Sequence, residues 1–379
     1  MSFRLGLTAA LLLLAGCASQ PMAGSTVDRE PDEAADHDPL LAKANVPHSV
    51  VAEAFVTAAT PDDNIDSPAA WTAPNGKVWL LATAKATEKL VIYDGDSGAT
   101  IRTFGTAGQG PGQFKRANGI FVHRDLVFVV ERDNHRVQVL ALPSLRSLAT
   151  FGDKDLVQPY GIWLQETQPG QLDVLVTDAY MAGEDAEGED VMPSLADLDR
   201  RIQRYTVRVD GASVSAEHVG AFGDTGEAGA IRIPESVWGD PANDRLLIAE
   251  EDTATGTALR EYDLGGHFRG RTIGLGLFKA QAEGIALWSC ADGSGYWLTT
   301  DQFKDRSLFH VFDRRTLQHV GAFAGKQVGN TDGVWLYQAG SVRFPKGVFY
   351  AVHDDMAVGA FDWRDVAKAL SLRADCTAG

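Results

Sequence analysis

The sequence has few cysteines, a minority of basic residues and no apolar run long enough to cross a membrane. Three cysteines in 379 residues exclude a small disulfide-stabilised scaffold. Lys and Arg number 34 against 51 Asp and Glu, so the formal net charge is −17 and the surface is unsuited to binding nucleic acid. An acidic surface favours cationic partners instead, metal ions in particular.

The first residues have the pattern of an export signal. Arg4 precedes the apolar run Leu5–Leu14, which is shorter than the roughly 20 residues of a membrane span and is followed by small residues. The segment up to Cys17 resembles a bacterial lipobox, which implies that residues 1–16 are a signal peptide and that Cys17 is lipidated. A plain signal peptide with a chance cysteine is the alternative. Ala18 resembles the outer-membrane form of the signal, so we expect an exported protein held in the cell envelope, with only its lipid anchor in the membrane.

Residues 17–46 are rich in Ser, Asp, Glu, Pro and Ala and predict a flexible tether, because they offer too little apolar surface to offset the entropy of ordering. Export permits a disulfide, and Cys290 and Cys376 are the remaining candidates. Their pairing would fasten the C-terminal tail to a late strand. Two separate thiols are equally compatible with the sequence.

The body of the chain is predicted to consist of short strands. β-branched and aromatic runs alternate with Gly, Asp, Asn and Pro. The runs include 77–82, 90–93, 126–131, 136–141, 172–177, 246–250, 296–299, 308–313 and 347–352. Helical patterns are confined to 194–201 and 363–372.

A repeated unit organises these strands. Each unit has a Pro- or Gly-led apolar run, a strand ending in an acidic residue, and two further strands. Units begin at Asp66, Asn118, Pro159, Ile233, Ala282 and Thr331. Repeats of this kind are typical of a propeller, so we predict an all-β, six-bladed β-propeller over residues 47–376, as a monomer, with an acidic insertion at 178–201. One or two β-sandwiches are the alternative.

One blade resembles an NHL repeat. The opening of that motif is matched by Gly108, Gly110, Pro111, Gly112, Gln113 and Phe114, and its closing by Asp133, Asn134, Arg136, Val137, Gln138 and Val139. Such repeats occur in propellers of many functions.

A second resemblance covers about 300 residues. The ordered motifs DSPAAW (66–71), KLVIYD (89–94), PYGIWL (159–164), PESVWGDPANDRLLIAEED (234–252), AEGIALWSCADGSGYWLTTDQ (282–302), HVFDR (310–314) and TDGVWL with FPKGVFYAVHDD (331–336, 344–355) are similar to those of the β-propeller phytases, the 3-phytase family. The resemblance implies a calcium-dependent phosphomonoester hydrolase that releases phosphate from phytate, or a related ester, by attack of a metal-activated water.

Many of the shared residues are carboxylates at strand ends and turns, which a propeller brings to one face of its channel. Carboxylates gathered there would repel one another unless a cation is present, and Ca²⁺ accepts about six to eight oxygen ligands. The resemblance implies metal ligation by Asp66, Glu235, Glu250, Glu251, Glu283, Asp332 and Asp354, with Asp252 and Asp355 in the same turns. It implies catalytic roles for Glu235, Glu251 and Glu283, and phosphate binding by Lys85, Lys89, Arg132, Arg136 and Tyr160. For each carboxylate, hydrogen bonding to turn amides is the alternative.

The chain departs from the phytase pattern in three places. Ser67 and Ser236 stand where the family has Asp and Gly, and the insertion 178–201 replaces a turn that carries a lysine. The insertion is therefore either a calcium-binding lid or a cover over the site. Two other functions are compatible with the sequence: a non-catalytic NHL-like propeller that binds a peptide, glycan or envelope partner, and, on fold analogy alone, a metal-dependent lactonase.

Overall fold

A computed structural model describes residues 39–188 and 190–376. The predicted signal peptide 1–16, the lipidation of Cys17 and the tether as far as residue 38 lie outside the described residues. Within the described part of the chain, no helix is long and apolar enough to cross a membrane.

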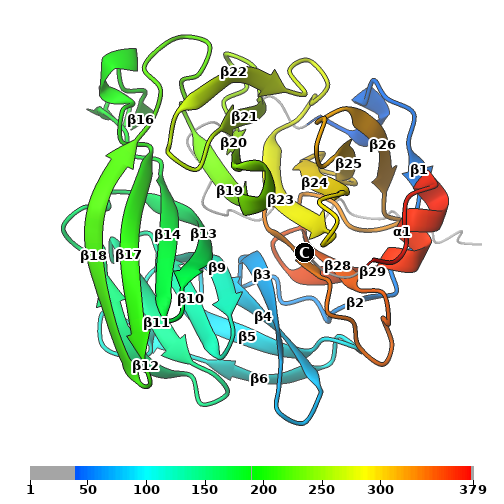
Figure 1. The fold of residues 1–379 in the computed structure, drawn as a ribbon, viewed down its shortest axis with the longest axis horizontal. Coiled ribbons are helices and arrows are strands. Elements are labelled where there is room, and N and C mark those ends of the chain that lie inside the picture. Colours follow the sequence, from blue (N-terminus) through cyan, green and yellow to red (C-terminus); the bar gives the residue numbers. More distant parts are fainter. Residues whose placement is uncertain (1–38, 189, 377–379) are drawn as a thin grey trace, which may run out of the picture.

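The protein is an all-β, six-bladed propeller, in which six sheets stand around a central axis (Figure 1). Blade 1 comprises β3 (Ile65–Thr72), β4 (Val78–Ala84), β5 (Lys89–Asp94) and β6 (Thr100–Phe104). Blade 2 comprises β9 (Ala117–His123), β10 (Leu126–Glu131), β11 (Arg136–Ala141) and β12 (Arg146–Phe151). Blade 3 comprises β13 (Pro159–Gln168), β14 (Gln171–Asp178), β17 (Ile202–Asp210) and β18 (Ser213–Phe222).

The second half of the chain repeats the arrangement. Blade 4 comprises β19 (Pro234–Asp240), β20 (Arg245–Glu250), β21 (Ala258–Tyr262) and β22 (Phe268–Ile273). Blade 5 has β23 (Ala282–Ser289), β24 (Gly295–Asp301), β25 (Leu308–Asp313) and β26 (His319–Ala324), and blade 6 has β27 (Val334–Tyr337), β28 (Val348–His353) and β29 (Ala357–Asp362). Two short pairs, β7 (Thr106–Ala107) with β8 (Gln113–Phe114) and β15 (Gly183–Glu184) with β16 (Asp190–Val191), lie outside the blades.

The two ends of the chain close the ring of blades together. The outer strand of blade 6 is β2 (Phe55–Val56), which comes from the N-terminal side and pairs antiparallel with β29. The preceding β1 (Ser49–Val50) adds a fifth, parallel strand to blade 5 beside β26. Opening the ring therefore requires breaking backbone hydrogen bonds within a sheet, and this stabilises the closed propeller.

The prediction of a flexible tether is wrong for residues 39–46. A 3₁₀ turn at Leu41–Lys43 buries Leu41 in an apolar cluster with Phe303 and Leu308 of blade 5. Asp305 accepts a hydrogen bond from the backbone amide of Leu41 at 2.7 Å. The buried leucine and the hydrogen bond to Asp305 both stabilise the ordered segment, and composition alone did not reveal these contacts.

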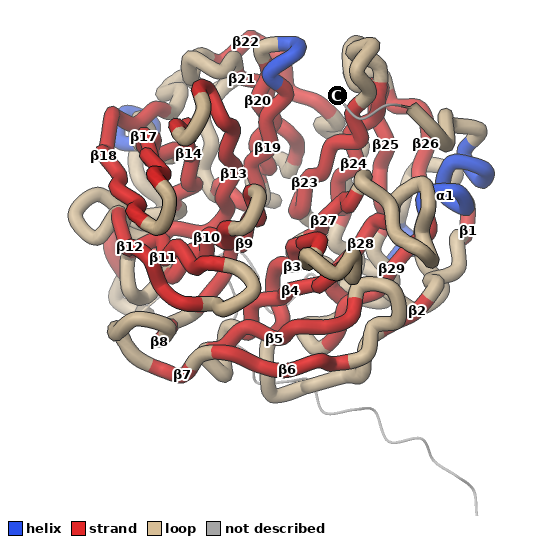
Figure 2. The backbone as a smooth tube through the Cα atoms, turned by 60° about the horizontal axis from the view of Figure 1, so that its bottom comes forward, coloured by secondary structure: helices blue, strands red, loops and turns tan. Residues whose placement is uncertain are grey.

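Cys290 and Cys376 form a disulfide, which decides between the two possibilities that the sequence left open. It fastens the C-terminal tail beyond α1 (Trp363–Leu370) to the end of β23. Trp363 stacks on Trp288 of that strand, with ring centroids 5.0 Å apart. The disulfide accordingly holds Cys376 at the end of β23, the inner strand of blade 5 beside the propeller axis (Figures 1 and 2).

The strand predictions hold closely, whereas one of the two helix predictions is wrong. Predicted strands 126–131, 136–141 and 308–313 coincide with β10, β11 and β25, and the other predicted runs fall on strands. The helix expected at 363–372 is α1, which ends two residues earlier at Leu370. At 194–201 there is only the 3₁₀ turn Leu195–Asp197, because this stretch is part of the insertion between β14 and β17.

Candidate functional site

The innermost strands of the six blades begin at the same end of the central channel, and each brings one polar residue there. In every blade this residue stands directly before a glycine or serine. The six are Asp66, Asn118, Tyr160, Glu235, Glu283 and Asp332, and we call them the channel ring. All are buried or nearly so, with Asp66 and Asn118 at 0% exposure.

The small residue after each ring position lets neighbouring inner strands approach closely. A Cβ on Gly119 would lie 2.4 Å from the carbonyl oxygen of Tyr160 in the next blade. A Cβ on Gly161 would lie 2.6 Å from the carbonyl oxygen of Glu235, and one on Gly333 would lie 2.6 Å from that of Asp66. Backbone carbonyls cannot move aside as side chains do, so these glycines set the diameter of the ring.

Lys85 is the cation of the channel ring. Its ammonium nitrogen lies 3.0 Å from Oδ2 of Asp66 and 3.8 Å from Oδ2 of Asp332. Asp66 also accepts hydrogen bonds from the Tyr160 hydroxyl at 2.9 Å and from Nδ2 of Asn118 at 3.3 Å. A fully buried carboxylate requires such partners, and blades 1, 2 and 3 each supply one.

The pKa of Asp332 reflects the crowding of carboxylates around it. Burial raises its pKa well above the usual range, Lys85 lowers it, and Asp355, Asp66 and Glu283 raise it further. Gln302 donates a hydrogen bond to its Oδ1 at 2.5 Å. Four acidic residues that are far apart in the sequence therefore lie in one small volume.

Acidic and basic side chains occupy different sides of the ring. Blades 4 to 6 supply Glu235, Glu251, Glu283, Asp332 and Asp355. Gln281 donates a hydrogen bond to Oε1 of Glu251 at 3.0 Å. On blade 2, Arg116 is buried; burial and the neighbouring Arg132 lower its pKa, while Glu235 is among the groups that raise it. Arg132 and Glu235 thus lie close to the same guanidinium.

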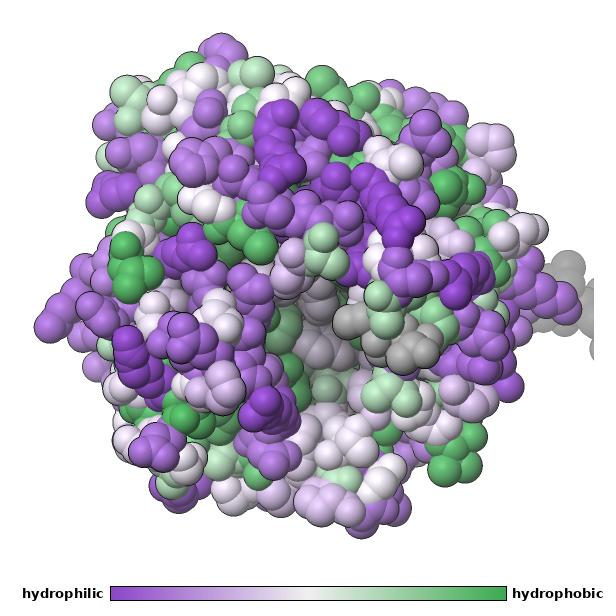
Figure 3. Space-filling view, viewed as in Figure 1, coloured by the Kyte–Doolittle hydropathy of each residue, from purple (hydrophilic) through white to green (hydrophobic). Residues whose placement is uncertain are grey.

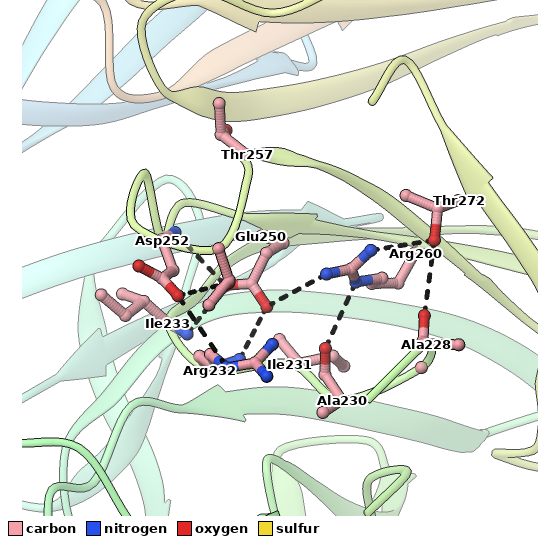
Figure 4. Close-up of polar contacts among 12 residues, drawn as sticks. Ala228, Ala230, Ile231, Arg232, Ile233, Glu250, Asp252, Thr257, Arg260 and Thr272 are labelled. Carbon is pink, nitrogen blue, oxygen red and sulfur yellow. Dashed lines mark hydrogen bonds and ion pairs between the residues drawn. The ribbon is translucent and has the colours of Figure 1, made fainter. Parts of the chain in front are cut away.

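Glu250, by contrast, is held by the backbone of its own blade (Figure 4). Its oxygens accept the amides of Arg232 at 2.7 Å and Ile233 at 2.9 Å, and Arg260 lies 3.9 Å away. Burial raises its pKa to about 7. These contacts are those of the alternative given above, a carboxylate bound to turn amides, and not those of the metal ligand expected from the sequence.

The same amide clamp recurs in two neighbouring blades. Asp178 accepts the amides of Val157 and Gln158 at 3.0 and 2.7 Å. Asp301 accepts those of Lys279 and Ala280 at 3.0 and 2.7 Å. In blades 3 to 5 the acidic residue that ends the second strand therefore fixes the segment leading into the inner strand, which explains why the repeat carries it.

Three other residues predicted for the site have local partners. Lys89 binds Asp63 at 2.8 Å, and Arg136 binds Oε1 of Glu131 at 2.9 Å and the carbonyl oxygen of Gln109 at 2.7 Å. Asp354 has a left-handed φ of 50°, and its amide donates to the carbonyl of Gly329. The structure thus gathers Lys85 and Tyr160, but not Lys89 or Arg136, around the ring carboxylates.

Sequence reasoning missed four polar residues of the site: Asn118, Gln281, Gln302 and Arg116. Asn118 was detectable, because it stands at the ring position of the second repeat unit. The glutamines and Arg116 flank the inner strands outside the repeat positions and had no comparable signal. The Oδ1 atom of Asn118 is buried and accepts no hydrogen bond from the described residues.

Among residues 39–188 and 190–376, no group of three or more His, Cys, Asp or Glu side chains is arranged to hold one metal ion. The ring carboxylates are close enough to shift one another's pKa, but Lys85 stands between Asp66 and Asp332. For Asp66 and Asp332 the positive partner is thus the Lys85 ammonium group.

Below the ring the channel narrows to a cavity of about 40 Å³, lined by Ser67, Gly119, Gly161, Ser236 and Gly333 among others. This volume admits water but not an organic ester. Phe121, Trp238 and Trp335 pack together at the same cavity, with ring centroids 5.0 to 5.5 Å apart. The face seen in Figure 3 is hollowed at its centre. The three aromatic rings pack against one another where they line the cavity.

The insertion between β14 and β17 is anchored at the ring end of blade 3. The buried Arg201 donates hydrogen bonds to four carbonyl oxygens, those of Asp178, Tyr180, Ile231 and Arg232. Its guanidinium also lies 4.3 Å from the centroid of the Tyr180 ring. Glu184, Asp185, Glu187 and Asp190 are exposed on the insertion, so a second acidic surface borders the site.

No protein-family model and no curated protein sequence matches this chain. Among solved structures, it is similar to Kuenenia stuttgartiensis hydrazine synthase (11% identity, TM-score 0.44, covering 78% of this chain and 75% of the other). It is also similar to a chain of a nidogen/laminin complex (15% identity, TM-score 0.42, covering 69% of this chain and 81% of the other). A third similar structure is the Myceliophteria thermophila Cps50 (Swd1) β-propeller domain (9% identity, TM-score 0.47, covering 81% of this chain and 98% of the other).

Proposed function

We propose that this chain is a calcium-dependent phosphomonoester hydrolase of the 3-phytase type, which releases phosphate from phytate or a related ester at the channel ring. The observation that carries the proposal is the meeting of Asp66, Glu283 and Asp355 around Asp332, with Lys85 between Asp66 and Asp332. A buried excess of carboxylates beside cationic side chains is what a site needs in order to bind a phosphate together with metal ions.

The basic side of the ring is suited to the phosphate group. Lys85, Arg116 and Arg132 offer ammonium and guanidinium donors within one end of the channel. A phosphate dianion competes with Asp66 and Asp332 for the Lys85 ammonium. Guanidinium groups bind phosphate oxygens in pairs, so the arginines would fix the orientation of the ester.

The donor chemistry of the acidic side fits calcium. It consists of the carboxylate oxygens of Glu235, Glu251, Glu283, Asp332 and Asp355, and the buried, unbonded Oδ1 of Asn118 on blade 2 is a further oxygen of the channel ring. We infer that Glu235, Glu251, Glu283 and Asp332 would hold the ion once Lys85 moves towards the substrate. Bound there, Ca²⁺ would neutralise negative charge on the phosphate oxygens and lower the pKa of a water.

The chain's own groups have distinct tasks in this proposal. Glu251 and Glu283 orient the attacking water, since a carboxylate accepts its hydrogen bonds. The Tyr160 hydroxyl, which donates to Asp66, holds that carboxylate in place as Lys85 changes partner. The packed rings of Phe121, Trp238 and Trp335 below the channel ring would confine substrate and product to one face of the propeller.

The test uses the chain without residues 1–20, incubated with phytate or p-nitrophenyl phosphate in Ca²⁺, with and without EGTA. We expect phosphate release that stops with the chelator and returns when calcium is added back. Absence of chelator-sensitive release on both substrates would overturn the proposal.

A non-catalytic propeller lipoprotein that binds a peptide, glycan or envelope partner is the second candidate. Lys85 already compensates two ring carboxylates, which favours a role that needs no metal. Recovery of a stable partner from envelope extracts, with no hydrolysis of either ester, would favour this function.

We place either function in the cell envelope, on the export and lipidation pattern of residues 1–17. Cys17→Ser should then move the protein from the membrane fraction to the soluble periplasmic fraction, whereas an unchanged distribution would argue against the anchor.

A further inference from the structure

Two histidines nine residues apart meet in a groove between blades 4 and 5. His310 lies on β25 and His319 begins β26, and Nδ1 of His310 is 3.1 Å from Nε2 of His319. His310 is fully buried, whereas His319 is exposed and lines the groove with Arg271, Thr272 and Leu277. The site belongs to the outer strands and shares no residue with the channel ring.

A buried carboxylate lies beside His310 on its other side, at ion-pair distance but with no hydrogen bond to Nε2 among the described residues. Nε2 of His310 lies 3.5 Å from Oδ2 of Asp301. Asp301 itself is fixed by the amides of Lys279 and Ala280. A carboxylate behind an imidazole is the usual outer partner of a metal-binding histidine, because it fixes the ring and raises the basicity of the opposite nitrogen.

Blade 4 shows what the same positions do without histidines. There Glu250, Arg260 and Thr272 form a row of interacting side chains that runs from the second to the fourth strand of the blade (Figure 4). Arg260 donates hydrogen bonds to Thr272 and to the carbonyl oxygen of Ala230, so this row is held together by hydrogen bonds. In blade 5, His310 occupies the position of Arg260 and Ala322 that of Thr272, whereas His319 reaches His310 from the position that Phe268 holds in blade 4. The two imidazoles have nitrogens that can bind a metal as well as each other.

We propose that His310 and His319 form a two-histidine site for a divalent transition-metal ion such as Zn²⁺, with Asp301 as the outer carboxylate. Two imidazole nitrogens bound at about 2.0–2.1 Å to one ion, at angles between square-planar and tetrahedral, lie about 2.9 to 3.4 Å apart. The observed 3.1 Å falls within that interval. Waters from the open groove complete the coordination.

The surroundings suit a neutral imidazole pair. A metal ligand must be a neutral imidazole, and the apolar rings around the pair favour that form. The rings of Phe278 and Phe312 pack against His310. Arg271 is the nearby cation that lines the groove, and Glu261 lies 3.4 Å from it and offsets its charge.

The test titrates Zn²⁺ into metal-free protein in excess Ca²⁺, which occupies oxygen-rich sites and leaves imidazole sites open. We expect one Zn²⁺ per chain, with affinity at least about tenfold weaker in His319→Gln. His267→Gln is the matched control. His267 is also exposed but lies on blade 4, and its loss should leave Zn²⁺ affinity unchanged.

Two further measurements keep the assignment testable if a variant is poorly folded. With Cu²⁺, electron paramagnetic resonance of the wild-type protein should show coupling to two imidazole nitrogens, and His319→Gln should retain at most one. Asp301→Asn should weaken Zn²⁺ binding without abolishing the two-nitrogen signal. Equal Zn²⁺ binding by wild type and His319→Gln, or no two-nitrogen signal in the wild type, would overturn the proposal.

Discussion

The ammonium nitrogen of Lys85 lies 3.0 Å from Oδ2 of Asp66, and both side chains are shielded from solvent. Asp332 is the second carboxylate of the same ammonium, at 3.8 Å. A buried ion pair is costly to break from one side, because the remaining charge has no water to solvate it. In the proposed function, a metal ion would therefore compete with Lys85 for Asp66 and Asp332, and the phosphate would compete with these carboxylates for the ammonium.

Removal of the Lys85 charge should separate its two roles. Lys85→Met is expected to lower kcat/KM for phytate by about a hundredfold or more, because a donor to the phosphate is lost. The uncompensated carboxylates should at the same time bind Ca²⁺ more tightly, so that calcium raises the Tm of the variant more than that of the wild type. Lys77→Met, at an exposed lysine, is the control and should match the wild type in both measurements. A variant with unchanged hydrolysis would remove Lys85 from the mechanism.

The ring carboxylate Glu283 should matter for activity rather than for folding. Glu283→Gln removes one of the charges that raise the pKa of Asp332, so stability should be unchanged or higher. Phosphate release at limiting calcium should fall by about a hundredfold and recover in part as calcium is raised. Glu217→Gln, at an exposed position on blade 3, provides the comparison. Full activity of the ring variant at limiting calcium would contradict this role.

The burial of Glu250 should make stability depend on pH. Its folded-state pKa is about 7, above the ordinary value of 4.5, so the folded protein binds the proton more tightly than the unfolded chain does. Stability should therefore fall as pH rises from about 4.5 to 7, by about 3 kcal/mol for this group. Urea unfolding at pH 5 and pH 8 measures the fall, which should be smaller by that amount in Glu250→Gln. An equal fall in both proteins would show that Glu250 does not titrate in this interval.

The disulfide should stabilise the propeller through the chain segment that it closes. Cys290 and Cys376 are 86 residues apart, and Cys290→Ser with Cys376→Ser should lower the free energy of unfolding by about 2 to 5 kcal/mol. Wild-type protein under reducing conditions should behave like the double variant in chemical unfolding. Ester hydrolysis by the folded protein should be unaffected, because the bond lies at the channel end opposite the ring.

The contact between inner strands leaves no room for a methyl group at Gly119. Gly119→Ala would bring Cβ to 2.4 Å from the carbonyl of Tyr160, so blades 2 and 3 must separate. We expect a loss of at least about 2 kcal/mol in chemical unfolding, together with a displaced Tyr160 and weaker hydrolysis. Gly226→Ala is the control, since its Cβ would meet only a flexible side-chain oxygen of Asp224. Equal stability of the two variants would mean that the blades can yield at this point.

The sequence by itself determined the strands, the repeat and the number of blades. These follow from local alternation of apolar residues and from turn residues, which act over a few positions, as in β10 and β25. It also indicated most of the acidic residues of the ring, because Asp66, Glu235, Glu283 and Asp332 occupy equivalent positions of the repeat.

Only the tertiary structure decided what neighbouring residues of one motif do. Glu250 and Glu251 are adjacent in sequence, yet Glu250 binds backbone amides of its own blade while Glu251 accepts a hydrogen bond from Gln281. Likewise, Lys85 meets Asp332 because strands from the two ends of the chain converge. The sequence states which side chains are charged, but the partner of each depends on which strands pack beside it. That packing is a property of the whole closed ring of blades.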